Sequence, residues 1–128
     1  MSPEIANRLA KARRFLDEAE RADPATSPLS IVHDCYYAMF HMALAVLAER
    51  TGSIPVRHGS VIGGFGRLVK DMGEEAKRHG RSFNDLQELR LVSDYAPEST
   101  PTEDDAFQAR QAAQAFLVFC SGLLDGGK

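Results

Sequence analysis

The segment from residue 90 to 95, which reads Arg-Leu-Val-Ser-Asp-Tyr, combines a cation, a carboxylate and a phenol within two helical turns. In a helix, Arg90 and Asp94 are one turn apart and can form an ion pair, worth about 0.3 kcal/mol where it is exposed. Alternatively, Arg90 and Tyr95 face a cleft with Tyr36 and Tyr37, because a guanidinium and phenols can bind a phosphate or a base. The spacing is compatible with both interpretations.

The four histidines, His33, His41, His58 and His79, are candidates for acid–base or metal chemistry. Metal sites in helical bundles use closely spaced ligands such as Glu-x-x-His, and the sequence has no such pair, no His-x-x-x-His and no Cys-x-x-Cys. It therefore predicts no metal and no other cofactor. His41 and His58 are the imidazoles that could work with Arg90. The alternative for His41 is a core histidine hydrogen bonded to a neighbour.

The two cysteines and a glycine-rich segment are assigned structural roles. Cys35 and Cys120 lie within apolar helical patterns, so we expect reduced core thiols of an intracellular protein. Burial raises the pKa of a thiol, which argues against Cys35 as a nucleophile. Residues 63–66, Gly-Gly-Phe-Gly, lack the strand and the Gly-Lys-Ser/Thr of a phosphate loop, so we expect close helix packing or a bend there.

The tyrosine pair belongs to the segment around which the rest of the chain is organised. Residues 35–48 contain no formally charged side chain, and a helix is predicted over 28–51. Ser27 supplies an N-cap hydroxyl, Pro28 suits the first helical position, and Gly52 can take the left-handed conformation after the end. A helix that is apolar on nearly all sides must be covered by other helices, by a partner subunit, or by both.

Apolar residues at three- to four-residue steps predict four more helices, at residues 2–22, from 58–60 onward, at 82–95 and at 102–126. Ser2, Ser82 and Thr102 are their expected N-caps, and Gly73 and Gly80 are two candidate ends for the third helix. The connections are short and no strand pattern is present. The chain is therefore predicted to be an all-α, antiparallel bundle of four to five helices.

Length and charge narrow the class of protein. At 128 residues the chain has the size of one domain, taken as residues 1–128, and its net charge of −3 argues against a general electrostatic attraction to nucleic acid. A local basic cluster or a solvated mixed-charge surface is formed by Arg67, Lys70, Lys77, Arg78 and Arg81. Because the start lacks a secretory pattern and the apolar run is too short for a membrane span, we expect a soluble cytoplasmic protein.

Three separated motifs resemble those of bacterial HEPN domains. They are Tyr-Tyr-Ala-Met-Phe-His at 36–41, His-Gly-Ser at 58–60 with Phe65 following, and Arg-x-x-x-Asp-Tyr at 90–95. The resemblance covers residues 1–125 and points to the branch related to toxins paired with minimal nucleotidyltransferases. It implies a four-to-five-helix bundle, commonly a homodimer, with a cleft near the dimer axis.

The resemblance also implies that RNA cleavage is one possible activity, since many HEPN proteins are metal-independent ribonucleases. Their signature is an arginine followed after four to six residues by a histidine, which acts as acid or base while the arginine stabilises the phosphate. Arg90 matches, but none of residues 91–97 is histidine, and Asp94 stands in this region. Catalysis would need an imidazole from another helix, so the sequence leaves open whether the chain is an enzyme.

Three functional hypotheses follow. The first is a toxin–antitoxin-type or RNA- or nucleotide-associated module that works with a minimal nucleotidyltransferase and binds through Arg90, Asp94 and the tyrosines of both motifs. The second is a metal-independent endoribonuclease that uses Arg90 with His58 or His41. The third is a non-catalytic helical interaction domain. The sequence names neither the RNA or nucleotide, nor the partner protein, nor any modification of Tyr95.

Overall fold

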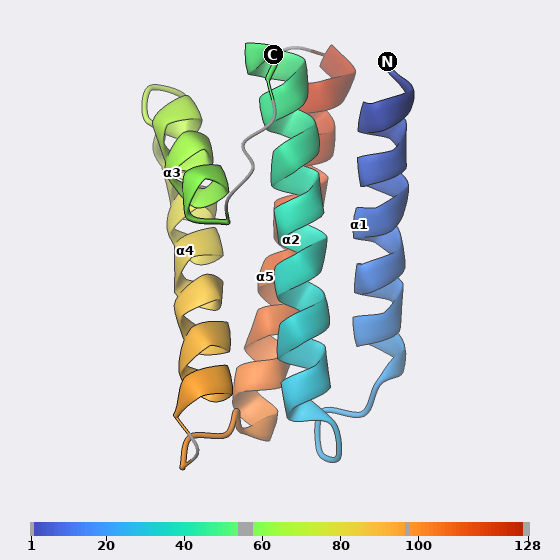
Figure 1. Ribbon diagram of the computed structural model, residues 1–128, viewed down its shortest axis with the longest axis vertical. Helices are drawn as coiled ribbons and strands as arrows, with labels where there is room; N and C mark the ends of the chain where they lie inside the picture. Colours follow the sequence, from blue (N-terminus) through green and yellow to red (C-terminus); the bar gives the residue numbers. More distant parts are fainter. Residues whose placement is uncertain (1, 54–57, 97, 127–128) are drawn as a thin grey trace.

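The computed structural model describes residues 2–53, 58–96 and 98–126. These residues form five helices and no strand (Figure 1), which confirms the predicted all-α bundle. The helices are α1 (Pro3–Arg21), α2 (Pro28–Thr51), α3 (His58–Val69), α4 (Glu74–Tyr95) and α5 (Glu103–Gly126).

Helix α2 is the centre of the bundle and contacts each of the other four helices. In Figure 1, α1 and α4 run antiparallel to α2, whereas α5 lies behind α2 and runs parallel to it. The parallel arrangement brings Arg50, near the end of α2, within 3.4 Å of the Leu123 carbonyl near the end of α5. By length and composition α2 could cross a membrane, but 78 % of its apolar window is buried in the bundle, as expected for a core helix.

The predicted ends of α1, α2 and α5 are confirmed, with one exception. Ser2 caps α1 by accepting a hydrogen bond of 3.2 Å from the amide three residues on, and Gly52 has φ +77° after α2. Before α5, the Asp105 amide donates to the Thr102 hydroxyl and the Thr102 amide donates to the Asp105 carboxylate. The exception is Ser27, whose side chain makes no capping hydrogen bond because its backbone, at φ −134° and ψ 47°, is not in the extended conformation of a cap.

The predicted start of the fourth helix at Ser82 was wrong, because α4 begins eight residues earlier, after Gly73 at φ +102°. Of the two candidate ends for the third helix, Gly80 was therefore also wrong, since it lies inside α4. A Cβ atom at Gly80 would lie 3.1 Å from Cγ2 of Val69, so glycine allows α3 and α4 to approach closely. Glu74 at the start of α4 complements the positive end of the helix dipole.

The glycines of α3 divide into two kinds. A Cβ atom at Gly64 would lie 3.4 Å from Cδ1 of Leu47, so the expected close packing against α2 is found there. A Cβ atom at Gly66 would meet nothing within 4 Å. Packing therefore accounts for Gly64 and leaves Gly66 without a structural reason.

Four aromatic side chains join α2, α3, α4 and α5 in the core. Tyr36, Phe65, Phe83 and Phe116 are all fully buried. The ring centroids of Phe65 and Phe116 are 5.0 Å apart, those of Phe83 and Phe116 are 5.4 Å apart, and those of Tyr36 and Phe83 are 6.0 Å apart. Because this cluster packs directly on Tyr36, it also positions one wall of the candidate site.

Candidate functional site

The candidate site lies where the N-terminal half of α2 packs against the C-terminal half of α4, in the lower half of Figure 1. We call it the Arg90 cluster, and it consists of His33, Tyr36, Tyr37, Arg90 and Asp94. On α2 the three side chains follow i, i+3 and i+4 spacing, and on α4 the two side chains follow i, i+4 spacing, so each set shares one helix face.

Arg90 is held on two sides. Its Nη1 lies 3.2 Å from Oδ2 of Asp94, and its guanidinium carbon lies 4.5 Å from the centroid of the Tyr36 ring and 5.8 Å from that of Tyr37. The arginine side chain is only 12 % exposed. The ion pair of the first interpretation and the arginine–tyrosine contact of the second are therefore both present in the structure.

Asp94 also binds a histidine that the sequence interpretation had not placed in the site. Nε2 of His33 lies 2.7 Å from Oδ1 of Asp94, so the two carboxylate oxygens engage two different side chains. The His33 side chain is 36 % exposed and that of Asp94 is 25 % exposed, so solvent reaches this side of the cluster. With Nε2 on the carboxylate, Nδ1 is the ring nitrogen that could serve a ligand.

One atom of the cluster is not satisfied within the described residues. The Nε atom of Arg90 is buried and has no hydrogen-bond partner there. A buried donor without a partner costs about 1–3 kcal/mol, and such a group in a native fold calls for an explanation. Arg90 therefore keeps one buried donor that no described residue uses.

Burial determines the protonation of two neighbouring groups. It raises the pKa of Tyr36 to about 12, although the nearby Arg90 guanidinium opposes the shift, so Tyr36 remains a neutral phenol. Burial, reinforced by the negative charge of Asp34, likewise raises the pKa of the Cys35 thiol to about 12. Neither group is ionised near neutral pH, so neither is available as a base or an anionic nucleophile.

His41 and His58 were the two histidines expected to act together with Arg90. His41 is buried, its Nδ1 lies 3.1 Å from Nη1 of Arg8, and its ring stacks on Phe15 with centroids 5.6 Å apart. These contacts direct it toward α1, as the core-histidine alternative predicted. His58 begins α3, and its side chain lies outside the part of the chain that the structure describes.

Tyr95, the last expected binding residue, is 79 % exposed at the end of α4. The structure thus brings together Tyr36, Tyr37, Arg90 and Asp94, and leaves Tyr95 on the adjoining surface. His33 was missed because it was weighed only as a metal ligand. Among the residues that the structure describes, no group of three or more His, Cys, Asp or Glu side chains could hold a metal ion.

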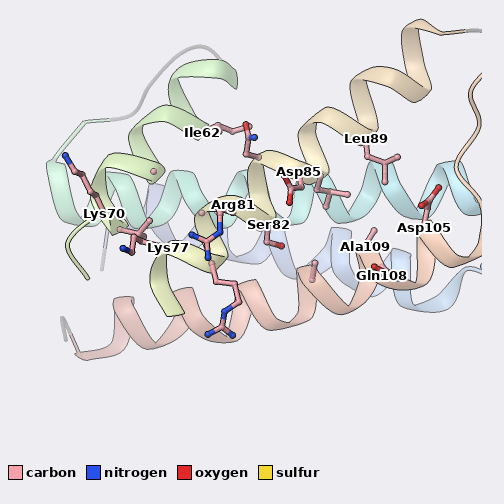
Figure 2. A pocket seen from close by; sticks show the side chains of 17 residues that line it. Ile62, Lys70, Lys77, Arg81, Ser82, Asp85, Leu89, Asp105, Gln108 and Ala109 are labelled. Atoms are coloured by element: carbon pink, nitrogen blue, oxygen red, sulfur yellow. The ribbon is translucent and has the colours of Figure 1, made fainter. Parts of the chain in front are cut away.

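A separate cavity of about 860 Å³ lies between α3, α4 and α5 and includes no residue of the Arg90 cluster. Figure 2 shows Lys70, Lys77 and Arg81 toward one end of it and Asp105 at the other. Four of the five residues in the basic cluster of the sequence line this cavity. Lys77, however, is 2.8 Å from the Glu74 carboxylate, which partly neutralises the cluster.

Comparisons with known proteins agree with this architecture. The family model of the HEPN domain matches residues 5–123. A curated UPF0332 protein from Thermotoga maritima (strain ATCC 43589 / DSM 3109 / JCM 10099 / NBRC 100826 / MSB8) is 27 % identical over 115 residues, which cover 90 % of this chain and 86 % of that protein. Because the family model spans nearly all of a five-helix bundle that carries the expected motifs, the chain belongs to the HEPN domain family.

Proposed function

We propose that the chain is the HEPN half of a toxin–antitoxin-type system, a homodimer that works with a minimal nucleotidyltransferase and binds RNA or a nucleotide through the Arg90 cluster. The observation that carries the binding part is the placement of Arg90 between the Tyr36 ring and the Asp94 carboxylate, with His33 on the solvent side. An arginine stacked on an aromatic ring and a nearby imidazole are suited to a phosphate and a base.

The partner part of the proposal draws on family membership and on two exposed side chains near the C-terminal end of α4. Val92 is 51 % exposed and Tyr95 is 79 % exposed, and their i, i+3 spacing places them on one face of α4 that is turned away from Arg90 and Asp94. Exposed aromatic and aliphatic side chains next to polar groups are typical of protein interfaces. A second copy of this chain or the nucleotidyltransferase would cover this surface.

A second candidate function, metal-independent endoribonuclease, gains support from His33. In this reaction Nδ1 of His33 would take the proton of a ribose 2′-hydroxyl, and the 2′-oxygen would attack the adjacent phosphorus. The bond to the 5′-oxygen would break, that oxygen would take a proton from water, and the products would be a 2′,3′-cyclic phosphate and a 5′-hydroxyl. Asp94 would orient the imidazole and Arg90 would stabilise the phosphate.

Binding is tested by titrating the full chain with a single-stranded RNA of mixed sequence, in low salt with EDTA, by isothermal titration calorimetry. Charged hydrogen bonds are worth about 1.5–3 kcal/mol, so Arg90→Met should weaken binding about tenfold or more. Arg21→Met is the matched control, because Arg21 also pairs with a carboxylate on its own helix, 2.8 Å from Glu18, but lies on α1. Equal affinities of both variants and the wild type would exclude the Arg90 cluster as the binding site.

The same samples, analysed by gel, separate the two candidate functions. Cleavage in EDTA that leaves cyclic phosphate ends and disappears in both Arg90→Met and His33→Gln would establish the ribonuclease. Binding without cleavage would favour the first function, a binding module without ribonuclease activity.

The partner protein is tested by a separate experiment. The chain is co-expressed with a minimal nucleotidyltransferase encoded beside it, and size-exclusion chromatography measures whether the two co-elute. Failure to co-elute would remove the partner from the proposal.

A further inference from the structure

The cavity of about 860 Å³ between α3, α4 and α5 is an elongated groove (Figure 2). Its lining residues on α4 extend from Lys77 to Leu89, which is about 18 Å along a helix axis. We propose that this groove receives an amphipathic helix of about three turns from the partner protein, with acidic side chains at the C-terminal end of that helix. This inference rests on the proposed function and names the surface at which the partner binds.

Three aromatic rings create the groove, because they hold its walls apart. Phe65 of α3, Phe83 of α4 and Phe116 of α5 are fully buried, and the centroids of Phe65 and Phe116 are 5.0 Å apart. Within the described residues, no Cα atom of α3 lies within 8 Å of one in α5, so side chains rather than close backbones join these two helices. The groove leaves apolar side chains only partly covered, namely Ile62, Leu89 and Ala112.

Gly66 keeps one wall of the groove low. It lines the groove from within α3, and a Cβ atom there would meet nothing within 4 Å. Glycine destabilises a helix relative to alanine, and no neighbour among the described residues requires it at this position. A helix that docks in the groove supplies a reason, because glycine lets another backbone approach closely.

The walls favour a helix over an extended segment. All three walls are helices, whose backbone N–H and C=O groups bond within each helix. They offer no strand edge, so an extended segment would bury backbone groups without partners. A helix satisfies its own backbone and can place apolar side chains at i, i+3 or i+4, and i+7 in the groove.

One end of the groove carries positive charge that the chain does not fully neutralise. The Glu74 carboxylate lies 2.8 Å from Lys77 and 4.0 Å from Arg81, so it is shared between two cations. Lys70 and Arg78 also line this end, are exposed, and make no ion pair with any described residue. This end of the groove is therefore suited to acidic side chains of a ligand.

The opposite charge at the other end sets the direction of the ligand helix. Figure 2 shows Lys70 and Lys77 toward one end of the groove and Asp85 and Asp105 toward the other. A helix is positive at its N-terminus and negative at its C-terminus. The docked helix therefore lies with its C-terminus at the lysines and its N-terminus at the aspartates, antiparallel to α4.

Two other occupants fit these charges less well. An RNA strand is negative along its whole length and would meet the aspartates as well as the apolar wall. Helix α5 of a second copy has exposed apolar side chains, since Phe107 is 49 % and Val118 is 75 % exposed. Its first turn, however, contains Glu103 and Asp104, which would lie against Asp85 and repel it.

The test measures binding of the purified nucleotidyltransferase to the full chain by calorimetry. Gly66→Leu fills the low wall and Arg78→Glu reverses a charge at the basic end, so each should weaken binding about tenfold or more. Arg14→Glu makes the same charge change at an exposed arginine of α1 that has no ion pair within the described chain. This control should bind within about threefold of the wild type. Circular dichroism checks that each variant is folded, and Arg78→Glu, on the exposed surface, keeps the test decisive if Gly66→Leu is not.

A cross-link identifies the occupant directly. Asn84 lines the groove and is exposed, whereas Cys35 and Cys120 are buried, so Asn84→Cys supplies an accessible thiol for a benzophenone label. Mass spectrometry of the irradiated complex should find the label joined to one helical segment of the nucleotidyltransferase, with acidic residues toward its C-terminal end. A label joined to a second copy of the chain, or to RNA, would overturn the inference.

The remaining outcomes separate this inference from the proposed function. If the nucleotidyltransferase binds the wild type and both groove variants equally well, the inference is wrong and the partnership stands. The same holds if Arg14→Glu weakens binding as much as Arg78→Glu, because the charge effect would then not belong to the groove. If the nucleotidyltransferase does not bind the wild type, the proposed partnership itself fails.

Discussion

Replacing Arg90 with methionine tests whether the Arg90 cluster is built for stability or for binding. Methionine has a similar unbranched stem, so the contacts of the arginine methylenes are largely kept and the guanidinium is removed. The ion pair with Asp94, at 3.2 Å, and the contact with the Tyr36 ring, at 4.5 Å, are lost. The buried Nε–H without a partner is lost as well.

These changes nearly cancel in free energy. The partly buried i, i+4 pair is worth about 0.3–1 kcal/mol and the arginine–tyrosine contact about 0.5–2 kcal/mol. Removing the unsatisfied donor recovers about 1–3 kcal/mol. We therefore expect the free energy of unfolding of Arg90→Met to lie within about 1 kcal/mol of the wild type. A purely structural buried pair would instead cost about 3–5 kcal/mol when broken.

The measurement is urea unfolding followed by circular dichroism, at one fixed chain concentration because a dimer would make stability depend on concentration. Arg110→Met serves as the structural control. Nη1 of Arg110 donates to the carbonyl groups of Ala19 and Ala22, at 3.3 Å each, and so ties α5 to the end of α1. This control should lose about 1–3 kcal/mol. A loss of 3 kcal/mol or more in Arg90→Met would refute the reasoning and restore the structural interpretation.

Three further predictions concern stability and reactivity. Gly66→Ala should stabilise the fold by about 0.8–1 kcal/mol, because residue 66 is helical and a Cβ atom there would meet nothing within 4 Å. The measurement is the melting temperature, which should rise. A lower melting temperature would contradict the helical conformation of residue 66. Burial lowers the pKa of His79, so the imidazole binds a proton more readily in the unfolded chain than in the folded one. The free energy of unfolding should therefore fall as the pH drops below about 6.5, the ordinary pKa of histidine. The His79→Gln variant should show a smaller fall. Burial also raises the pKa of both cysteine thiols, so Cys35 and Cys120 should resist Ellman's reagent until urea unfolds the chain, and rapid labelling of the folded chain would show that the thiols are accessible.

Helix identity could be predicted from the sequence wherever local signals agreed. The central helix, its proline start and its glycine end are read from apolar spacing and cap residues, and the structure has Pro28 and Gly52 in those places. The start of α4 could not be predicted in this way. Ser82 has the chemistry of a cap and stands two residues after Gly80, but that glycine serves the contact with Val69 instead. A glycine that ends a helix and one that lets two helices approach look alike in a sequence.

In the candidate site, too, the contact within one helix could be predicted from the sequence and the contact between two helices could not. The i, i+4 pair of Arg90 and Asp94 was predicted because both partners lie on one helix, where spacing determines proximity. The contact between His33 and Asp94 joins residues 61 positions apart, and only the packing of α2 against α4 brings them together. A usable signal did exist, since His33 stands one turn before the two tyrosines on the same face of α2. If the tyrosine face meets the arginine face, the histidine at i−3 must meet the residue one turn after the arginine, and this reasoning identifies Asp94 as its partner.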